Sequence, residues 1–85
     1  MELIDTVKMM QSDDYKERFK AEYYQLKIRY EKLKDFTNRL MVAEIMKTEP
    51  PKHDTPKSVL IEQYSYMGLY LGILEQRAII ENIEL

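Results

Sequence analysis

"TEPPKHDTP", residues 48–56, interrupts an otherwise helical sequence and decides the fold. Its two adjacent prolines cannot continue a helix, because proline lacks the amide hydrogen and clashes with the preceding turn. Long stretches of helical composition lie on both sides, so the chain must turn back here and pair them as an antiparallel hairpin. After the break we expect Asp54 or Thr55 to cap the next helix, with Pro56 in its first turn.

The residues before this break have the spacing of one long amphipathic helix, residues 13–47. Apolar residues recur there at steps of three and four, which is the period of a helix face. They are Phe19, Tyr23, Leu26, Tyr30, Leu33, Phe36 and Leu40. The preceding "QSDD", residues 11–14, offers a capping side chain. Residues 1–11 have the pattern of a short helix.

The residues after the connecting loop, residues 48–55, predict a second long helix over residues 56–83. Its apolar residues form more than one stripe, whereas a surface helix normally has one. Val59, Tyr66, Ile73 and Ile80 recur every seven residues, and Leu60, Met67 and Leu74 form a second row. One hairpin partner cannot cover this much surface. We therefore expect a single all-α domain over residues 1–85: a short N-terminal helix plus two long antiparallel helices, in an oligomeric helical assembly.

Both glycines of the chain, Gly68 and Gly72, lie four residues apart in this second long helix. Each costs the helix about 1 kcal/mol relative to alanine. The G-x-x-x-G spacing lets another backbone come close, so we predict oligomer contacts at these glycines and at Tyr66 and Tyr70. Two alternatives remain: the glycines relieve crowding against the chain's own first long helix, or they let a ligand approach.

Composition excludes several classes of protein. The 85 residues contain no cysteine and one histidine, His53, so disulfides are excluded and no metal site or other cofactor is expected. So short a chain buries a thin core, which favours reinforcement by self-association. No apolar run is long enough to span a membrane and no signal peptide is recognised, so no membrane partner is expected. The formal net charge of −2 argues against binding a DNA or RNA polymer.

The first long helix is nevertheless locally basic. Between Lys16 and Arg39 there are eight basic residues against four acidic ones, with tyrosines interleaved. Basic side chains bind phosphates and aromatic rings stack on bases, which indicates a nucleotide ligand. The alternative is a solvated helix face with salt bridges. No serine has a histidine at a suitable spacing and no Gly-rich phosphate loop is present, so we expect no enzyme activity.

Two stretches taken together resemble a known family. They are "YKERFKAEYYQLKIRYEKLKDF", residues 15–36, and "LIEQYSYMGLYLGILEQRAI", residues 60–79. The Tyr, Arg and Gln positions in this ordered pair resemble small helical proteins related to a crAss-like phage protein, and through them the phage anti-CBASS cyclic-oligonucleotide sponges. The resemblance covers about half of the chain.

The resemblance implies a non-enzymatic homohexamer that binds cyclic dinucleotides between protomers, and in some members cyclic trinucleotides in separate pockets. Such a sponge sequesters a second messenger in the cytoplasm of the infected bacterial host. A tyrosine near the start of the long helix and a basic residue further along contact the ligand in that family, and the matching positions are Tyr15 and Arg29. We add Arg18, Lys27 and Arg77 as further ligand-binding candidates.

A geometric test bears on this implication. Tyr15 and Arg29 are fourteen residues apart, which is roughly 21 Å along a helix. A cyclic dinucleotide is shorter, so both residues reach one ligand only from different chains. The alternative function is a helical protein-binding module, either an anti-CRISPR-like inhibitor or a structural assembly protein, which would explain the many tyrosines and methionines by an exposed docking patch.

Overall fold

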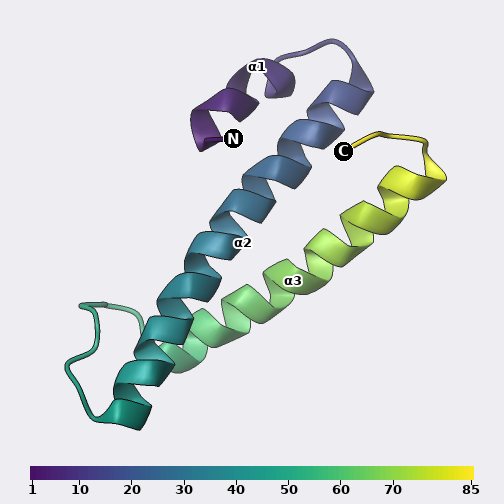
Figure 1. Cartoon of the computed structure of the whole chain (residues 1–85). Helices are drawn as coiled ribbons and strands as arrows, with labels where there is room; N and C mark the ends of the chain where they lie inside the picture. Colours follow the sequence, from purple (N-terminus) through teal and green to yellow (C-terminus); the bar gives the residue numbers. More distant parts are fainter.

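The computed structural model describes all 85 residues, and its regular structure is entirely helical. A 3-10 turn, Leu3–Asp5, leads into the short helix α1, Thr6–Met10. Two long helices follow, α2 over Tyr15–Met46 and α3 over Lys57–Ile80. The helix α1 folds back beside the first half of α2, and α3 runs antiparallel to α2 (Figure 1). The predicted all-α architecture, a short N-terminal helix plus two long ones, is confirmed.

Local sequence explains both ends of α2. At the start, the carboxylate of Asp14 accepts a hydrogen bond from the backbone N–H of Lys16 at 2.9 Å, which satisfies one of the free donors of the first turn. At the other end, Lys47 takes a left-handed conformation with φ of 56°, and the N–H of Thr48 donates to the carbonyl of Ala43 at 2.9 Å. This turn ends the helix, and the prolines that follow prevent it from continuing into the loop.

The helix α3 begins and ends differently from the sequence-based expectation. Its N-cap residue is Pro56, and no side chain caps it, so neither Asp54 nor Thr55 has the expected role. The helix ends at Ile80 because Asn82 is left-handed, with φ of 57°. The N–H of Ile83 then donates to the carbonyl of Ala78 at 2.8 Å, and Ile83 turns back into the core.

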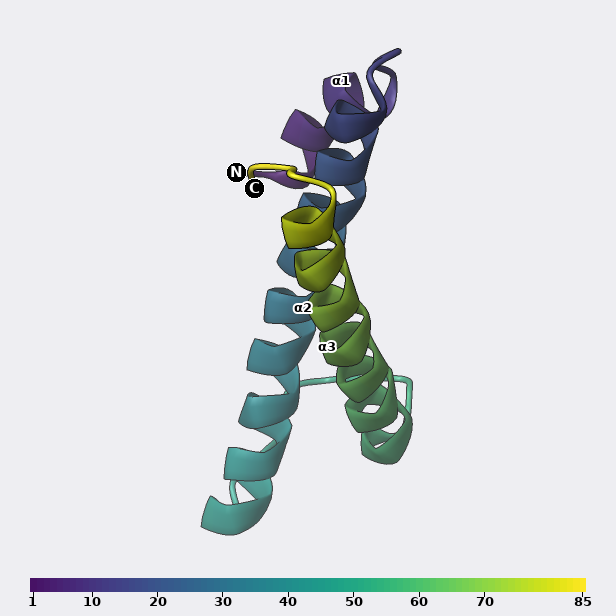
Figure 2. The same ribbon diagram turned by 90° about the vertical axis from the view of Figure 1, so that its right-hand side faces the viewer.

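The hydrophobic core lies at the end of the hairpin where α2 begins and α3 ends. Its buried members are Phe19, Tyr23, Leu71, Leu74, Ala78 and Ile83, with Tyr24, Leu26 and Tyr30 partly buried against them. Only 11 of 85 residues are buried, so the core is thin, as expected for a chain of this length. The two helices separate toward the loop in Figure 2 but toward the core end in Figure 1, so α2 and α3 cross at an angle.

The two glycines of α3 have different surroundings. A Cβ atom built on Gly68 would lie 3.2 Å from Cε1 of Tyr30, so this glycine makes room for a ring of the same chain. That ring also stacks on Tyr64, with the ring centres 5.5 Å apart. A Cβ atom on Gly72 would meet nothing within 4 Å. Gly68 thus fits the intrachain alternative, whereas nothing inside the chain requires a glycine at position 72.

One face of α3 is left uncovered by α2. We call it the outer face; it is formed by Val59, Tyr66, Tyr70, Ile73 and Ile80. All five side chains are exposed, although they are large and apolar. A shallow groove of about 420 Å³ runs along part of this face and is lined also by Gln63 and Met67. None of the helices is long and apolar enough to cross a membrane.

Candidate functional site

Three side chains form a hydrogen-bonded cluster where α2 begins and α3 ends. We call Tyr15, Arg77 and Glu81 the terminal cluster. The Tyr15 hydroxyl donates to Oε1 of Glu81 at 2.7 Å and accepts from Nη2 of Arg77 at 2.7 Å. The Arg77 Nε donates to Oε2 of Glu81 at 3.0 Å. Two predicted ligand-binding residues, Tyr15 and Arg77, are thus brought together although they are 62 residues apart.

The fold positions each member of this cluster. Tyr15 is the first residue of α2, Arg77 lies in the last turn of α3, and Glu81 is the residue that caps α3. The Arg77 guanidinium lies over the ring of buried Phe19, 5.2 Å from its centre, which holds one face of the guanidinium in place. The antiparallel hairpin therefore creates the cluster.

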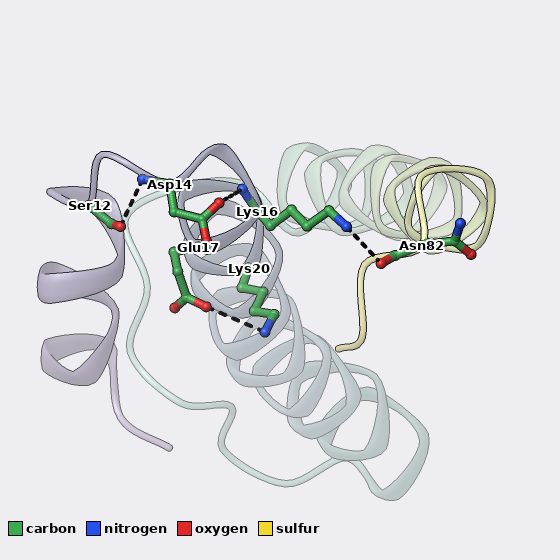
Figure 3. Close-up of polar contacts among 6 residues, drawn as sticks. All are labelled: Ser12, Asp14, Lys16, Glu17, Lys20 and Asn82. Carbon is green, nitrogen blue, oxygen red and sulfur yellow. Dashed lines mark hydrogen bonds and ion pairs between the residues drawn. The ribbon is translucent and has the colours of Figure 1, made fainter.

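A second cation lies beside the cluster. Lys16 extends from the first turn of α2 and donates from Nζ to the carbonyl of Asn82 at 3.2 Å (Figure 3). Figure 3 also shows Asp14 at the N-terminal end of the same helix, capping the amide of Lys16. Lys16 therefore links α2 to the segment after α3 and places a positive charge near Glu81.

The electrostatics agree with this geometry. The hydroxyl of Tyr15 and the guanidinium of Arg77 both donate to Glu81 and hold the pKa of its carboxyl below the usual value. The same hydrogen bond to Glu81 raises the pKa of Tyr15, because an ionised phenol could no longer donate it. Glu81 also raises the pKa of Arg77. Glu81 is therefore ionised, and Tyr15 and Arg77 are donors, at neutral pH.

The cluster has the geometry of an anion site. Two donors from different helices each bind one oxygen of the same carboxylate. The non-bridging oxygens of a phosphodiester present the same pattern of paired acceptors, and arginine binds such pairs well. Nη1 of Arg77 makes no hydrogen bond within the chain, so it remains free for another acceptor.

Two other predicted ligand-binding residues make no hydrogen bond or ion pair with the cluster. The side chain of Arg18 donates from Nη1 to the carbonyl of Ser12 at 2.7 Å and so holds the turn before α2. Lys27 lies with its Nζ 5.9 Å from the ring centre of Tyr23. It borders a hollow of about 240 Å³ that is also lined by Gly68. Neither side chain makes a hydrogen bond to Tyr15.

Arg29 is exposed on another surface of α2 and makes no hydrogen bond or ion pair within the chain. It borders two adjoining hollows of about 330 and 390 Å³, and α3 contributes Gln63 and Met67 to both. Leu3 from the N-terminal turn closes one side of the larger hollow. Since α2 is unbroken, Arg29 and Tyr15 are separated by about 21 Å along its axis. One chain does not bring them together.

The predicted oligomer contacts are distributed over α3. Tyr66 and Tyr70 are exposed on the outer face, and Gly72 opens on free space. Gly68, in contrast, is in contact with Tyr30 of its own chain. Three of the four residues are therefore accessible to a partner. No group of three or more histidine, aspartate or glutamate side chains is placed to hold a metal ion.

Residues 13–80 match the sequence model of a family described as Sequestin. The chain belongs to the Sequestin family. The match covers α2, the loop and α3, and it includes Tyr15, Arg29 and Arg77. The family name denotes sequestration, which is a function of binding. No curated protein and no solved structure matches the chain.

One member of the terminal cluster of this Sequestin-family protein, Glu81, was not predicted from the sequence. Glu81 lies one residue beyond the matched region and reads as a solvated surface acid. A signal was present, because Arg77 and Glu81 have the i, i+4 spacing of a helical ion pair. The bond from Tyr15 to Glu81 had no such signal, since its partners are 66 residues apart and meet only through the register of the hairpin.

Proposed function

We propose that the protein is a phage anti-defence sponge that binds and sequesters cyclic di- or trinucleotides. In this proposal it acts in the cytoplasm of the infected bacterial host, as a homo-oligomer for which the resemblance implies a hexamer, and it does not cleave its ligand. Membership of the Sequestin family supports sequestration. The resemblance to anti-CBASS sponges supports the cyclic-nucleotide ligand.

The observation that carries the proposal is the pair of converging donors in the terminal cluster, Tyr15 and Arg77, which together bind one carboxylate, that of Glu81. Tyr15 supplies an exposed aromatic ring for base stacking, and Arg77 supplies a guanidinium suited to a phosphodiester. Lys16 adds a second positive charge nearby. A ring, a phosphate donor and local positive charge are the elements that a small nucleotide ligand requires.

The uncovered outer face of α3 supports the homo-oligomer that the proposal requires. Arg77 lies on the helical face of α3 that also carries Ile73 and Tyr70, so a second copy docked on the outer face would border the terminal cluster. Arg29 of another copy is then the residue that completes the site, since its own chain holds it about 21 Å from Tyr15. Five exposed large apolar side chains on one face are also costly to leave in water.

Ligand release without cleavage is part of the proposal. The chain has no cysteine, and its single histidine, His53, lies exposed in the loop with Nδ1 2.9 Å from the carbonyl of Pro51. It therefore has neither a thiol nucleophile nor a histidine near Tyr15 or Arg29 that could act as a general base. Recovering the intact cyclic nucleotide from the heat-denatured complex, by chromatography, tests this part directly.

Isothermal calorimetry against a panel of cyclic di- and trinucleotides tests the main claim. Replacing Tyr15 by alanine removes a stacking platform worth about 1–3 kcal/mol, so we expect at least about tenfold weaker binding. Arg29→Ala removes a charge-assisted contact of about 1.5–3 kcal/mol and should have a similar effect. Affinity should fall as salt rises, because phosphate contacts are screened.

Matched variants separate these effects from changes in net charge. Arg39→Ala removes the same charge from the same helix, but at a residue that pairs only with Asp35 on the surface, and it should bind normally. Tyr15→Phe keeps the ring and loses the hydroxyl, so it should bind better than Tyr15→Ala. If no cyclic nucleotide binds below about 10 μM, which is roughly 7 kcal/mol of binding free energy, the sponge proposal fails.

The groove on the outer face favours the second candidate function, a helical protein-binding module. It is apolar, about 420 Å³ in volume and bordered by Tyr66 and Tyr70, which suit a protein partner. The two functions differ in what the basic residues do. A protein binder would keep its partner after Arg29→Ala and Arg77→Ala but lose it after Tyr66→Ala, whereas the sponge requires the arginines.

A further inference from the structure

The anion position in the terminal cluster is already filled by a group of the same chain, the carboxylate of Glu81. We propose that Glu81 is an internal competitor: its carboxylate occupies the site between Tyr15 and Arg77 until a phosphate group of the ligand displaces it. This inference rests on the proposed function and adds to it the way in which the site opens.

The donors stay in place when Glu81 leaves. Arg77 is held against the ring of Phe19, which is buried, and it donates to the Tyr15 hydroxyl independently of the carboxylate. Tyr15 is fixed by its place in the first turn of α2. A phosphate that replaces the carboxylate therefore meets preorganised donors and can also use the free Nη1 of Arg77, which lowers the cost of ordering the site.

Displacement requires only a side-chain rotation. The backbone N–H of Glu81 donates to the carbonyl of Arg77 at 2.8 Å, and the chain beyond it is anchored by Ile83, which is buried. The Glu81 side chain is 30 % exposed, so its carboxylate can turn into water without breaking a backbone hydrogen bond. The ends of α2 and α3 remain joined meanwhile by Lys16 and the carbonyl of Asn82.

Charge makes the exchange selective for phosphates. With Glu81 in place, its negative charge offsets one of the two positive charges of Arg77 and Lys16. Once it turns away, both charges face the ligand, while Glu22 is the remaining acid close to Arg77. A phosphodiester is attracted by the two exposed positive charges. An uncharged ligand has no such attraction to offset the contacts that Glu81 loses.

The test compares Glu81→Gln with Glu84→Gln. Both remove one negative charge near the C-terminus, but Glu84 is exposed and makes no hydrogen bond or ion pair. We expect Glu81→Gln to bind the cyclic nucleotide about three- to tenfold more tightly, the size of the released ion pair and hydrogen bond, and Glu84→Gln to bind like the unchanged protein. Equal affinities in all three proteins would overturn the inference.

A second variant and a second probe keep this result separate from the proposed function. Glu81→Asp retains the charge but shortens the reach, so it should also bind more tightly. Inorganic pyrophosphate is then titrated while the Arg77 Nε–H resonance is followed by NMR. This resonance should shift at a lower pyrophosphate concentration in Glu81→Gln than in the unchanged protein. If no cyclic nucleotide binds, the proposed function fails, and the pyrophosphate titration alone tests whether Glu81 is displaced. Identical titration curves for the unchanged protein and Glu81→Gln, or no shift of the resonance in any protein, would refute displacement.

Discussion

Replacing Gly72 tests the predicted self-association separately from the stability of the helix. Gly72 has ordinary helical backbone angles, and a Cβ atom there would meet nothing within 4 Å. Gly72→Ala should therefore stabilise α3 by about 1 kcal/mol, the propensity difference between the two residues. Inside a single chain no packing term opposes that gain. The isolated chain should melt higher.

An intermolecular contact at Gly72 reverses the outcome. If a partner backbone approaches the missing side chain, Gly72→Leu inserts a bulky group into a close contact, and such overpacking costs about 1–3 kcal/mol at each interface. A ring assembly repeats that cost in every subunit. We therefore expect Gly72→Leu to lower the oligomer mass by light scattering while helix content by circular dichroism stays unchanged.

Gly68→Ala is the matched control, because its new Cβ would lie 3.2 Å from the Tyr30 ring of the same chain. The displaced ring should cancel part or all of the stability gained from helix propensity. The oligomer mass should not change. If Gly72→Leu assembles fully and melts higher than the unchanged protein, Gly72 is not at a contact and the reasoning is refuted.

Three further predictions concern the core and the polar links across the hairpin. Leu74→Ala, at a side chain with no exposed surface, should lower the free energy of unfolding by roughly 3 kcal/mol in urea titrations. Burial, with a hydrogen bond to Glu75, raises the pKa of Tyr23 to about 12. The folded state therefore holds this proton more tightly, and stability should fall by up to about 2–3 kcal/mol between pH 10 and 12 but less in Tyr23→Phe, as followed by circular dichroism. The pKa of Glu81 is lowered, so the dependence of stability on pH has the opposite sign. The stabilisation by ionised Glu81 is present above its ordinary pKa of 4.5 and is lost as the pH falls through its pKa in the folded state. The melting temperatures of the unchanged protein and Glu81→Gln should therefore converge in acid.

The sequence was sufficient to predict the helices because their signals are local. The two prolines after Thr48 separate α2 from α3, and the spacing of apolar residues marks the buried face of each helix. Of the apolar series in α2, Phe19, Tyr23 and Leu40 are buried. The predicted helix ran to residue 83, three residues beyond the observed end of α3 at Ile80, although asparagine is, after glycine, the residue that most often takes the left-handed conformation seen at Asn82.

Only part of the candidate site could be predicted from the sequence. The family resemblance, together with the locally basic first long helix, drew attention to Tyr15 and the arginines, but neither showed which of these residues meet. Arg77 joins Tyr15 because the hairpin places the end of α3 beside the start of α2, and this register depends on tertiary packing around Leu74. Glu81, whose partners include a residue 66 positions away, could be found only from the fold.

The terminal cluster has a structural role beside the binding role proposed for it, and this should couple ligand binding to stability. The carboxylate of Glu81 bonds to Tyr15 of α2 and to Arg77 of α3, so it links the two helices at the end of the hairpin where the core lies. A phosphate that takes its place must bridge the same two donors and so replaces that link instead of breaking it. Binding should therefore raise the melting temperature, because a ligand bound only to the folded state stabilises it by mass action. It should raise it more for Glu81→Gln than for the unchanged protein, because only in the unchanged protein does part of the binding energy go to displacing the carboxylate.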